Sequence, residues 1–368
     1  MSLLTNQSFA CPTAEMEVER AVSELRYGRP VVLDDGRRRL AALALDCVAP
    51  SLYDQFAAAT DHRHALLLTA PRATRLGILG DGDVLAPLSG IPFSAAAQMA
   101  YGLGAKGPDR WLPADALASH SAELARLALL LPAMVVADVS GCGERFAGCC
   151  RLEANRLKGA DEARQRFDRV ARTRVPLEDL GDVDFVVYRG GLAQKDQVAL
   201  VVGTPDLGRA VPIRIHSSCI TGDLCRSLKC DCGDQLRNGL ALLQAAGGGV
   251  LLYLDQEGRG TGIGAKMRAY GHQHLGLDTI DADAELGLAE DHRRYEAAVA
   301  MLRDLGIATV AVYTNNPTKI AALRAGGIAV ETRAPVTGRV TQENAFYLRT
   351  KTLRAGHLLD LDTLVAAE

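Results

Sequence analysis

The chain has 368 residues, of which 48% are hydrophobic and 36 are glycine, as in ordinary soluble α/β enzymes with many tight turns. Its net charge of −3 argues against a protein whose main partner is a nucleic-acid backbone, so no nucleic-acid partner is expected. The length exceeds the usual single-domain size of about 100 to 200 residues, so two domains are expected.

The start of the chain, MSLLTNQSFACPT, contains no basic segment followed by a long apolar run. The longest purely apolar stretch, residues 127–137, is too short to span a bilayer and contains Pro132. We therefore expect a cytoplasmic protein with no membrane partner. In such a protein, nine cysteines are better interpreted as thiols or metal ligands than as a disulfide framework.

Residues 1–145 are expected to form the first domain. They carry apolar runs of strand and helix length, such as residues 30–33 and the helical pattern of residues 122–131. Residues 146–171 are expected to form a linker, because this region is rich in charged, helix-favouring residues and poor in β-branched ones. The second domain is expected to occupy residues 172–368.

The second domain is expected to begin with a small antiparallel sheet, because short β-branched segments alternate there with Gly and Pro. These segments are residues 184–188, 198–202 and 211–215. Helices and strands then alternate. The expected helices are residues 233–244, 265–275 and 293–305 and one after Pro317; the expected strands are residues 250–254 and 307–313. The predicted fold class is α/β (α+β), with a mixed sheet in the second domain and ligand-binding loops at the strand ends.

Residues 219–233 read CITGDLCRSLKCDCG, the densest motif in the chain. The thiols of Cys219, Cys230 and Cys232 could converge on a zinc ion and leave its fourth tetrahedral position open for water. Zinc lowers the pKa of bound water to about 7, which provides a nucleophile at neutral pH. A single cysteine is more often simply buried, but three at this spacing favour a metal site. Cys225 lies between them and could be a spare ligand.

Residues 254–264, LDQEGRGTGIG, follow an expected strand and precede an expected helix. Glycines in such a loop let backbone N–H groups approach phosphate oxygens. The spacing matches neither a dinucleotide fingerprint nor a P-loop, so taken alone the loop could be a flexible connection. Arg259 adds a planar fork suited to bidentate phosphate contact, which favours an anion site.

Two further motifs place polar residues beside expected helices. Residues 286–295 read LGLAEDHRRY, in which Asp291 could cap the next helix or form a base and phosphate-clamp pair with an arginine. Residues 313–319 read YTNNPTK, where Asn-Asn-Pro is first a turn signal and a lone lysine is usually solvated. Thr314 and Lys319 at the carboxyl end of a strand are nevertheless well placed for an anion.

Together, these motifs resemble GTP cyclohydrolase II of riboflavin biosynthesis. The ordered blocks R-x-H-S-x-C-x-T-G-D, S-L-x-C-D-C-G-x-Q-L, Q-E-G-R, D-T, L-G-x-x-x-D-x-R and T-N-N-P-x-K all occur between residues 214 and 319. The resemblance implies a zinc-dependent enzyme that opens the guanine imidazole ring of GTP. The expected products are formate, pyrophosphate and 2,5-diamino-6-ribosylamino-4(3H)-pyrimidinone 5′-phosphate. It also implies one zinc ion per subunit, Mg²⁺ with the GTP phosphates, and a homodimer.

The resemblance assigns the zinc ligands to Cys219, Cys230 and Cys232. It implies that Tyr270 lies in the active site, that Asp291 accepts a proton, and that Arg293 is a nucleophile at the α-phosphate. Because guanidinium stays protonated in proteins, electrostatic stabilisation is an equally good role for this arginine. The residues implied to hold GTP are Arg214, Ile215, His216, Ser217, Ser218, Gln235, Glu257, Gly258, Arg259, Thr279, Thr314 and Lys319.

One position departs from the family pattern. Related chains usually carry Glu immediately before the first zinc cysteine, and this chain carries Ser218. A carboxylate missing beside the metal and the substrate could change the rate or the recognition of the base. The zinc ligands themselves match.

The first half more faintly resembles 3,4-dihydroxy-2-butanone 4-phosphate synthase, which precedes the cyclohydrolase in fused bifunctional proteins. Residues 21–33 fit the start of that family and residues 120–132 a late segment. The acidic block D-D-x-x-R-E-N-E-G-D, which holds Mg²⁺ and substrate in that family, reads DDGRRRLAAL from Asp34. Arg, Leu and Ala cannot replace carboxylates at a metal site. We therefore expect a non-catalytic α+β domain, kept for dimerisation or regulation.

Two alternatives remain open from the sequence. A paralogue could use the same fold in another pathway, such as pyrimidine catabolism, and Ser218 together with the altered first half keeps this alternative open. A GTP-binding regulator with a structural zinc ion is the other. The presence of Tyr270, Asp291 and Arg293 argues against it, because a binding module has no need of a catalytic group.

Overall fold

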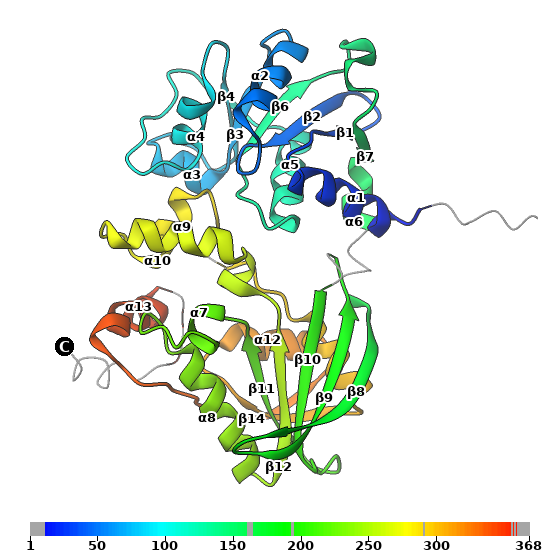
Figure 1. The fold of residues 1–368 in the computed structure, drawn as a ribbon, viewed down its shortest axis with the longest axis vertical. Coiled ribbons are helices and arrows are strands. Elements are labelled where there is room, and N and C mark those ends of the chain that lie inside the picture. The colour runs from blue at the N-terminus through cyan, green and yellow to red at the C-terminus, as the bar shows by residue number, and fades with distance from the viewer. Residues whose placement is uncertain are drawn as a thin grey trace, which may run out of the picture.

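The computed structural model describes residues 12–159, 165–192, 195–289 and 291–354, together with residues 356 and 358. Two seven-stranded sheets lie one above the other in Figure 1, each with helices against it. The predicted two-domain α/β fold is therefore confirmed. No helix in the described ranges is both long and apolar enough to cross a bilayer.

The first sheet has the strand order β5-β4-β3-β6-β2-β1-β7. Its pairs are antiparallel except for β1 with β7, which is parallel. The strands are β1 (Val31–Asp34), β2 (Arg39–Ala44), β3 (Ala65–Leu68), β4 (Val84–Pro87), β5 (Leu112–Pro113), β6 (Met134–Asp138) and β7 (Cys150–Glu153). Alternate residues of a strand point to opposite faces, so this sheet has a core on each side.

One face of the first sheet is covered by α1 (Ala14–Arg26), α5 (Ala116–Leu127) and α6 (Ala154–Gly159). The other face is covered by α2 (Pro50–Ala59), α3 (Ala70–Arg75), α4 (Phe93–Tyr101) and η1 (Gly143–Phe146). In β2, Leu40 and Ala42 belong to the first core, whereas Ala41 and Leu43 belong to the second. The period-two pattern of the strand therefore builds both layers.

The first domain extends further along the chain than expected, into the predicted linker. Strand β7 and helix α6 lie inside the expected linker, residues 146–171, yet both pack with the first domain. Strand β8 (Phe167–Leu177) already belongs to the second sheet. Residues 160–164 of the expected linker lie outside the described residues.

The second sheet has the order β14-β13-β11-β12-β10-β9-β8. Strands β8, β9 (Gly181–Gly190), β10 (Lys195–Gly203) and β12 (Gly248–Leu254) pair antiparallel. Strands β12, β11 (Val211–Ser217), β13 (Thr309–Tyr313) and β14 (Ala329–Ala334) pair parallel. The expected small antiparallel sheet is thus one half of a larger mixed sheet. The motif loops after β11, β12 and β13 leave the same edge, where ligands bind in such sheets.

Helices cover both faces of the second sheet. Helix α8 (Cys232–Ala245) packs on one face through Leu243, and α11 (Glu296–Asp304) and α12 (Pro317–Ala325) pack on the other. The remaining elements of this half are α7 (Ile220–Asp223), η3 (Glu257–Gly260), α9 (Ile263–His274), α10 (Thr279–Glu285) and α13 (Gln342–Leu353). Helix α11 begins at Glu296 with Tyr295 as its N-cap, so Asp291 does not cap it.

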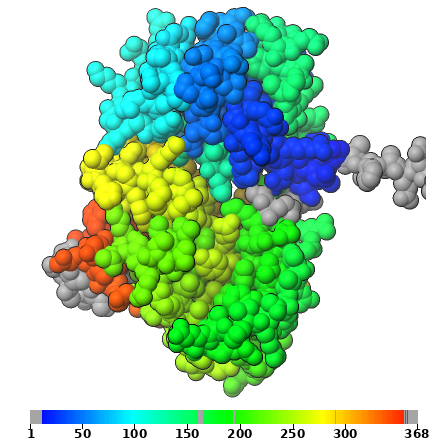
Figure 2. Space-filling model, in the orientation of Figure 1, coloured from blue at the N-terminus to red at the C-terminus, as the bar shows by residue number. Residues whose placement is uncertain are grey.

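Helices α9 and α10 belong to the second half by sequence but pack against the first domain. Their buried residues Ala265, Ala269, Ala282 and Leu286 join the core cluster of the first sheet and neither cluster of the second. In Figures 1 and 2 these yellow helices lie between the two sheets, against the cyan and blue elements of the first domain. The first domain therefore supports α9 and α10 through a shared apolar core.

Candidate active site

Three cysteines converge at the sheet edge. The ligand atoms of Cys219, Cys230 and Cys232 all lie within 4.8 Å of one another, and Cys219 Sγ is 3.7 Å from Cys230 Sγ. Among the described residues, this is the only group of three metal-ligating side chains brought together in this way. The fourth cysteine of the motif, Cys225, is exposed and lies outside the group. The geometry fits the three thiolates expected of a catalytic zinc site.

Two glycines allow the three thiols to meet. A Cβ atom at Gly222 would lie 2.9 Å from Cys230 Sγ and 3.1 Å from Cys219 Sγ, in the space between the sulfur atoms. A Cβ atom at Gly233 would lie 2.2 Å from the carbonyl oxygen of Gly222. Both positions therefore require glycine, which explains why T-G-D and C-D-C-G frame the cysteines.

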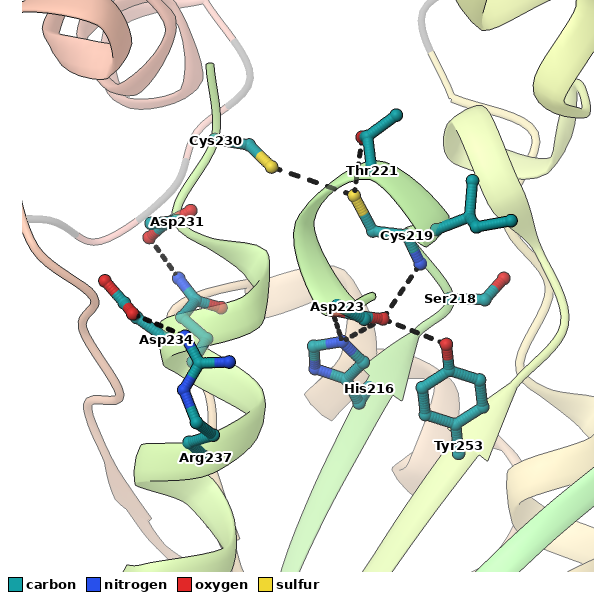
Figure 3. A network of polar contacts seen from close by, with 12 residues as sticks. His216, Ser218, Cys219, Thr221, Asp223, Cys230, Asp231, Asp234, Arg237 and Tyr253 are labelled. Carbon is teal, nitrogen blue, oxygen red and sulfur yellow. Dashed lines mark hydrogen bonds and ion pairs between the residues drawn. The ribbon is translucent and has the colours of Figure 1, made fainter. Parts of the chain in front are cut away.

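A buried carboxylate, that of Asp223, holds the backbone of Cys219 in place. Asp223 accepts a hydrogen bond from the backbone N–H of Cys219 at 3.0 Å and from the hydroxyl of Tyr253 at 2.9 Å. His216 Nε2 lies 3.1 Å from Asp223 Oδ1, and the ring of His216 stacks on Tyr253. Figure 3 shows this network beneath the turn that carries Cys219. Such supporting hydrogen bonds fix the direction of a metal ligand.

A lysine places a positive charge beside the cysteines. Lys266 Nζ donates hydrogen bonds to Cys219 Sγ at 3.1 Å, Thr221 Oγ1 at 3.0 Å and Glu257 Oε1 at 2.8 Å. Hydrogen bonds from Cys230 and Cys232, together with this ammonium group, lower the pKa of the Cys219 thiol. The site therefore favours a thiolate, the form that binds zinc, at Cys219, whereas hydrogen bonding to Cys219 and burial raise the pKa of Cys230 and Cys232.

The Gly-rich loop after β12 turns tightly beside the cysteines. Gly258 and Arg259 both have positive φ, at 62° and 59°. A Cβ atom at Gly260 would lie 2.7 Å from the carbonyl oxygen of His292, so glycine allows residues 292–293 to approach this loop. The backbone N–H of Gln256 donates to Ser218 Oγ at 3.1 Å. Ser218, at the position where a carboxylate was expected, thus ties the loop to the end of β11.

A basic cavity of about 360 Å³ adjoins the cysteines. Arg214, Arg259, Arg293, Lys319 and Lys351 line it, so a substrate entering it meets a strongly positive surface. Such a surface suits the phosphates of a nucleotide.

Two of the cations in this cavity are deeply buried. Arg214 is 3% exposed and donates hydrogen bonds to the carbonyl oxygen of Tyr313 at 3.0 Å and to Gln235 Oε1 at 2.7 Å. Lys319 Nζ donates to the carbonyl oxygen of Ile215 at 2.7 Å. Burial lowers the pKa of Arg214 to about 10, and burial and nearby cations lower that of Lys319. An incoming anion would relieve the repulsion among these groups.

Asp291 and Arg293 form a close pair at the junction of this cavity with the cysteine cluster. Arg293 Nη2 donates to Asp291 Oδ2 at 2.6 Å, and Arg293 Nε donates to Asp291 Oδ1 at 3.0 Å. Burial alone would lower the pKa of Arg293, but its hydrogen bonds to Asp291 raise it. The same bonds lower the pKa of Asp291, although burial opposes this. The two side chains are therefore an ionised pair.

A second cavity, of about 110 Å³, opens directly onto the cysteines. Tyr270 of α9 and Thr279 and Asp283 of α10 line it together with the Gly-rich loop. Burial raises the pKa of Asp283 to about 7, although Arg259 lies 3.5 Å away. The two cavities share walls at Ser217, Cys232, Arg259, Arg293 and Tyr347, so a single elongated ligand could occupy both.

Comparisons with known proteins agree with this geometry. A family model described as GTP cyclohydrolase II matches residues 168–335. A GTP cyclohydrolase-2 of Xylella fastidiosa (strain 9a5c) is 52% identical over 357 residues, which are 96% of this chain and 90% of that relative. A GTP cyclohydrolase-2 of Azospirillum brasilense is 38% identical over 360 residues and covers 93% of each chain. The chain belongs to the GTP cyclohydrolase II family.

It is therefore an enzyme, and GTP cyclohydrolase II catalyses the first step of riboflavin biosynthesis. Similarity to a riboflavin biosynthesis protein RibBA of Bacillus mycoides is shorter, with 44% identity over 183 residues, 50% of this chain and 46% of that relative. A solved two-domain 3,4-dihydroxy-2-butanone 4-phosphate synthase from A. baumannii is 18% identical, with a TM-score of 0.30. That match covers 86% of this chain and 99% of the synthase.

The structure brings the residues expected from the GTP cyclohydrolase II motifs to the two cavities, with one exception. The cavity at the cysteines contains the three thiols, Tyr270, Ser217, Ser218, Glu257, Gly258, Arg259, Thr279 and Arg293. The basic cavity contains Arg214, His216, Gln235, Asp291, Thr314 and Lys319. Ile215 lies in neither lining, because its side chain is fully buried in the core of the second sheet.

Sequence reasoning missed several side chains of the site. Lys266 and Asp283 lie on helices whose register relative to the loops is set by packing, and no motif singled them out. Tyr347, Lys351 and Arg354 come from α13 and the residue after it, far along the chain, yet line the basic cavity. The position of Lys266 one turn after the Gly-rich loop was the one available signal.

Proposed function

We propose that GTP lies across the two cavities, with its guanine beside the cysteines and its triphosphate in the basic cavity. The observation that carries this proposal is that the two cavities share Cys232, Arg259 and Arg293 as walls. A purine nucleotide has a matching two-part structure, an uncharged planar base joined to an anionic tail.

The donor set fits zinc, because three thiols face one point and a Cβ atom at Gly222 would fill the space between them. When bound, zinc supplies Lewis-acid activation of water for attack on C8 of guanine. Cys219, Cys230 and Cys232 would hold the ion. Lys266 would offset the negative charge of the three thiolates, since its ammonium lies 3.1 Å from Cys219 Sγ.

Ring opening requires hydrolysis of both C–N bonds at C8, which releases that carbon as formate. Hydrolysis of these bonds requires proton transfers, and Tyr270 and Asp283 line the cavity in which they would take place. Asp291 accepts a proton in this proposal, and Ser217, Ser218 and Thr279 orient the base. Because Ser218 Oγ accepts a hydrogen bond from the N–H of Gln256, the main contribution of Ser218 is to fix the Gly-rich loop.

Release of pyrophosphate requires water to cleave the bond between the α- and β-phosphates. Arg214, Arg259 and Lys319 would bind the triphosphate with Thr314 and Gln235 beside them. We assign Arg293 an electrostatic role at the α-phosphate, because its pairing with Asp291 raises its pKa and keeps it protonated. Mg²⁺ would bind the phosphates and share in stabilising the leaving group.

The decisive assay uses purified, zinc-loaded protein with GTP and Mg²⁺ and measures formate and pyrophosphate together. Stoichiometric release of both is expected, with neither product from a Cys230→Ser variant. Pyrophosphate without formate would mean that the phosphate cavity works but the base is wrongly placed. Neither product from zinc-loaded protein would refute the proposal.

We further propose that the first domain is not a synthase. Asp34 is paired with Arg151 at 2.5 Å, and Asp35 Oδ1 accepts hydrogen bonds from the N–H groups of Arg37 and Arg38 at 2.9 Å. Both carboxylates thus serve the local fold. In the described part of this domain no group of three metal-ligating side chains is found. No formation of 3,4-dihydroxy-2-butanone 4-phosphate is expected, and its detection would refute this assignment.

The protein is also proposed to be a homodimer, as the family resemblance implies. Sedimentation equilibrium of the full chain would test this, with a mass of twice 39.1 kDa expected.

A further inference from the structure

The first domain touches the two helices that form one wall of the cavity at the cysteines. Helix α9 carries Lys266 and Tyr270, and α10 carries Thr279 and Asp283. Neighbouring residues on the same helices, Ala265 and Ala269 of α9 and Ala282 of α10, are buried in the core cluster of the first sheet. The position of this wall is therefore set by a domain that contributes no side chain to the cavity at the cysteines.

Two glycines mark close contacts near the ends of this helical pair. A Cβ atom at Gly262, just before α9, would lie 3.2 Å from Cβ of Leu129 in the first domain. A Cβ atom at Gly287, just after α10, would lie 2.9 Å from Oγ1 of Thr69. That hydroxyl donates a hydrogen bond of 2.7 Å to the carbonyl oxygen of Gly287. The first domain thus contacts both α9 and α10 beyond their shared apolar face.

A buried ion pair joins the two domains at α10. Arg72 of α3 is 1% exposed and Glu285 of α10 is 5% exposed, and the two side chains are directly paired. Arg72 also donates to the carbonyl oxygens of Met99 at 3.0 Å and Gly102 at 2.7 Å, at the end of α4. Arg75 Nε donates to the other oxygen of Glu285 at 2.8 Å. Glu285 is thereby fixed to α3, and Arg72 connects that helix to the end of α4.

This arrangement goes beyond ordinary packing. A buried ion pair adds little net stability compared with apolar side chains of similar volume, but its geometry is strict. Glu285 lies at the last turn of α10, and Thr279, which faces the substrate cavity, lies at the first. Anchoring one end of such a short helix fixes the position of the other.

We propose that Arg72 and Glu285 are positioning residues for the reaction, through which the first domain holds Thr279 and Asp283 in place against GTP. The inference rests on the proposed role of Thr279 in binding the substrate. It gives the domain without a synthase site a task in the cyclohydrolase reaction.

The test is Glu285→Gln, which keeps the shape of the side chain and removes its charge. KM for GTP is expected to rise by several-fold, on the order of tenfold at most, with kcat and zinc content little changed. The melting temperature should fall, because Arg72 stays buried without its carboxylate partner. Arg145→Met is the matched control, because it removes an exposed ion pair with Asp61 within the first domain. Its KM should equal that of the parent.

A double-mutant cycle separates positioning from general destabilisation. The effects of Glu285→Gln and Thr279→Val on KM should be non-additive, because one acts through the other. Glu285→Gln and Lys319→Met should be additive, since Lys319 holds the phosphates from α12. Additivity in both cycles, or a parallel fall in kcat and zinc content, would overturn the inference.

Two further outcomes distinguish a failure of the positioning role from a failure of the proposed substrate contact at Thr279. If Thr279→Val leaves KM unchanged, the proposed substrate contact is wrong. If Thr279→Val raises KM but Glu285→Gln does not, only the positioning role is refuted. Should Glu285→Gln fail to fold, Thr69→Val serves instead, because it removes the single hydrogen bond to Gly287 and keeps the side-chain volume.

Discussion

The ammonium group of Lys266 lies 3.1 Å from the sulfur of Cys219, so the zinc site has a cation in contact with one of its ligands. Three thiolates and Zn²⁺ carry a net charge of −1, which this lysine offsets. Lys266→Met is therefore expected to weaken zinc binding by roughly 10- to 100-fold, as loss of a group supporting a metal ligand usually does. Competition with a chromophoric chelator measures the affinity.

Lys229→Met provides the control for this substitution. Lys229 also lies near Tyr270, but its ammonium group is bonded to His274 Nε2 at 3.3 Å and not to a cysteine. Its zinc affinity should match that of the parent. Equal affinities for the parent and Lys266→Met would show that the charge of Lys266 does not support the metal.

Gly222→Ala should abolish the zinc site. Its added methyl group would lie 2.9 Å from Cys230 Sγ and 3.1 Å from Cys219 Sγ, where an ion bound by these sulfurs has to lie. We expect zinc content close to zero by atomic absorption and no formate release. Gly264→Ala is the control, because a Cβ atom there meets no atom within 4 Å. Full zinc occupancy in Gly222→Ala would contradict the assigned geometry.

Asp283 should make stability depend on pH. Burial raises its pKa in the folded protein to about 7 from an ordinary value of 3.8. Its contribution to the free energy of unfolding is therefore fully present below about pH 4 and is lost as the pH rises through 7. Asp283→Asn removes this loss, so its stability relative to the parent should be greater at pH 8 than at pH 5.5.

The difference between the two pH values is at most about 2 kcal/mol, because roughly 1.5 units separate pH 5.5 from the folded pKa of about 7 and each unit is worth about 1.4 kcal/mol. Urea unfolding of both proteins at the two pH values measures it. Asp281→Asn, which changes a more exposed carboxylate on the same helix, is the control and should show no such difference. The same stability difference between the two proteins at both pH values would mean that Asp283 is already ionised in the folded protein at pH 5.5.

Arg293→Lys tests whether the arginine acts as a charge or as a nucleophile. Lysine keeps the positive charge but loses the planar fork that holds Asp291. With an electrostatic role, Arg293→Lys should retain on the order of a tenth to a hundredth of kcat, and Arg293→Met should lose roughly another tenfold. Trapping a phosphorylated Arg293 in the parent protein would instead establish the nucleophilic role.

Sequence could predict those parts of the site that lie in short contiguous motifs. The three cysteines and Gly222 form one loop, so their chemistry and spacing are visible together. Lys351 reaches the basic cavity from α13 only after the chain has folded, and no local pattern marks it. Asp283 needs burial to raise its pKa, which is a property of the tertiary structure alone.

The fold was predictable to a similar degree. The alternating strands and helices of the second half follow apolar periodicity, which the sequence displays. The first part of strand β8, residues 167–171, was expected to belong to a charged linker, because the strand lies at the edge of its sheet and is exposed along most of its length. Edge strands commonly carry charged residues that prevent pairing with other chains, so their composition resembles that of a polar segment.

The packing of α9 and α10 against the first sheet has a consequence for how the chain folds during synthesis. Ala265, Ala269, Ala282, Leu286 and Leu288 complete a core whose other buried members lie between residues 32 and 142. The ribosome synthesises the first domain well before these residues. Until they emerge, the nascent first domain exposes the apolar face that they cover. Folding of the two halves is then coupled, and heat should unfold them in a single cooperative transition.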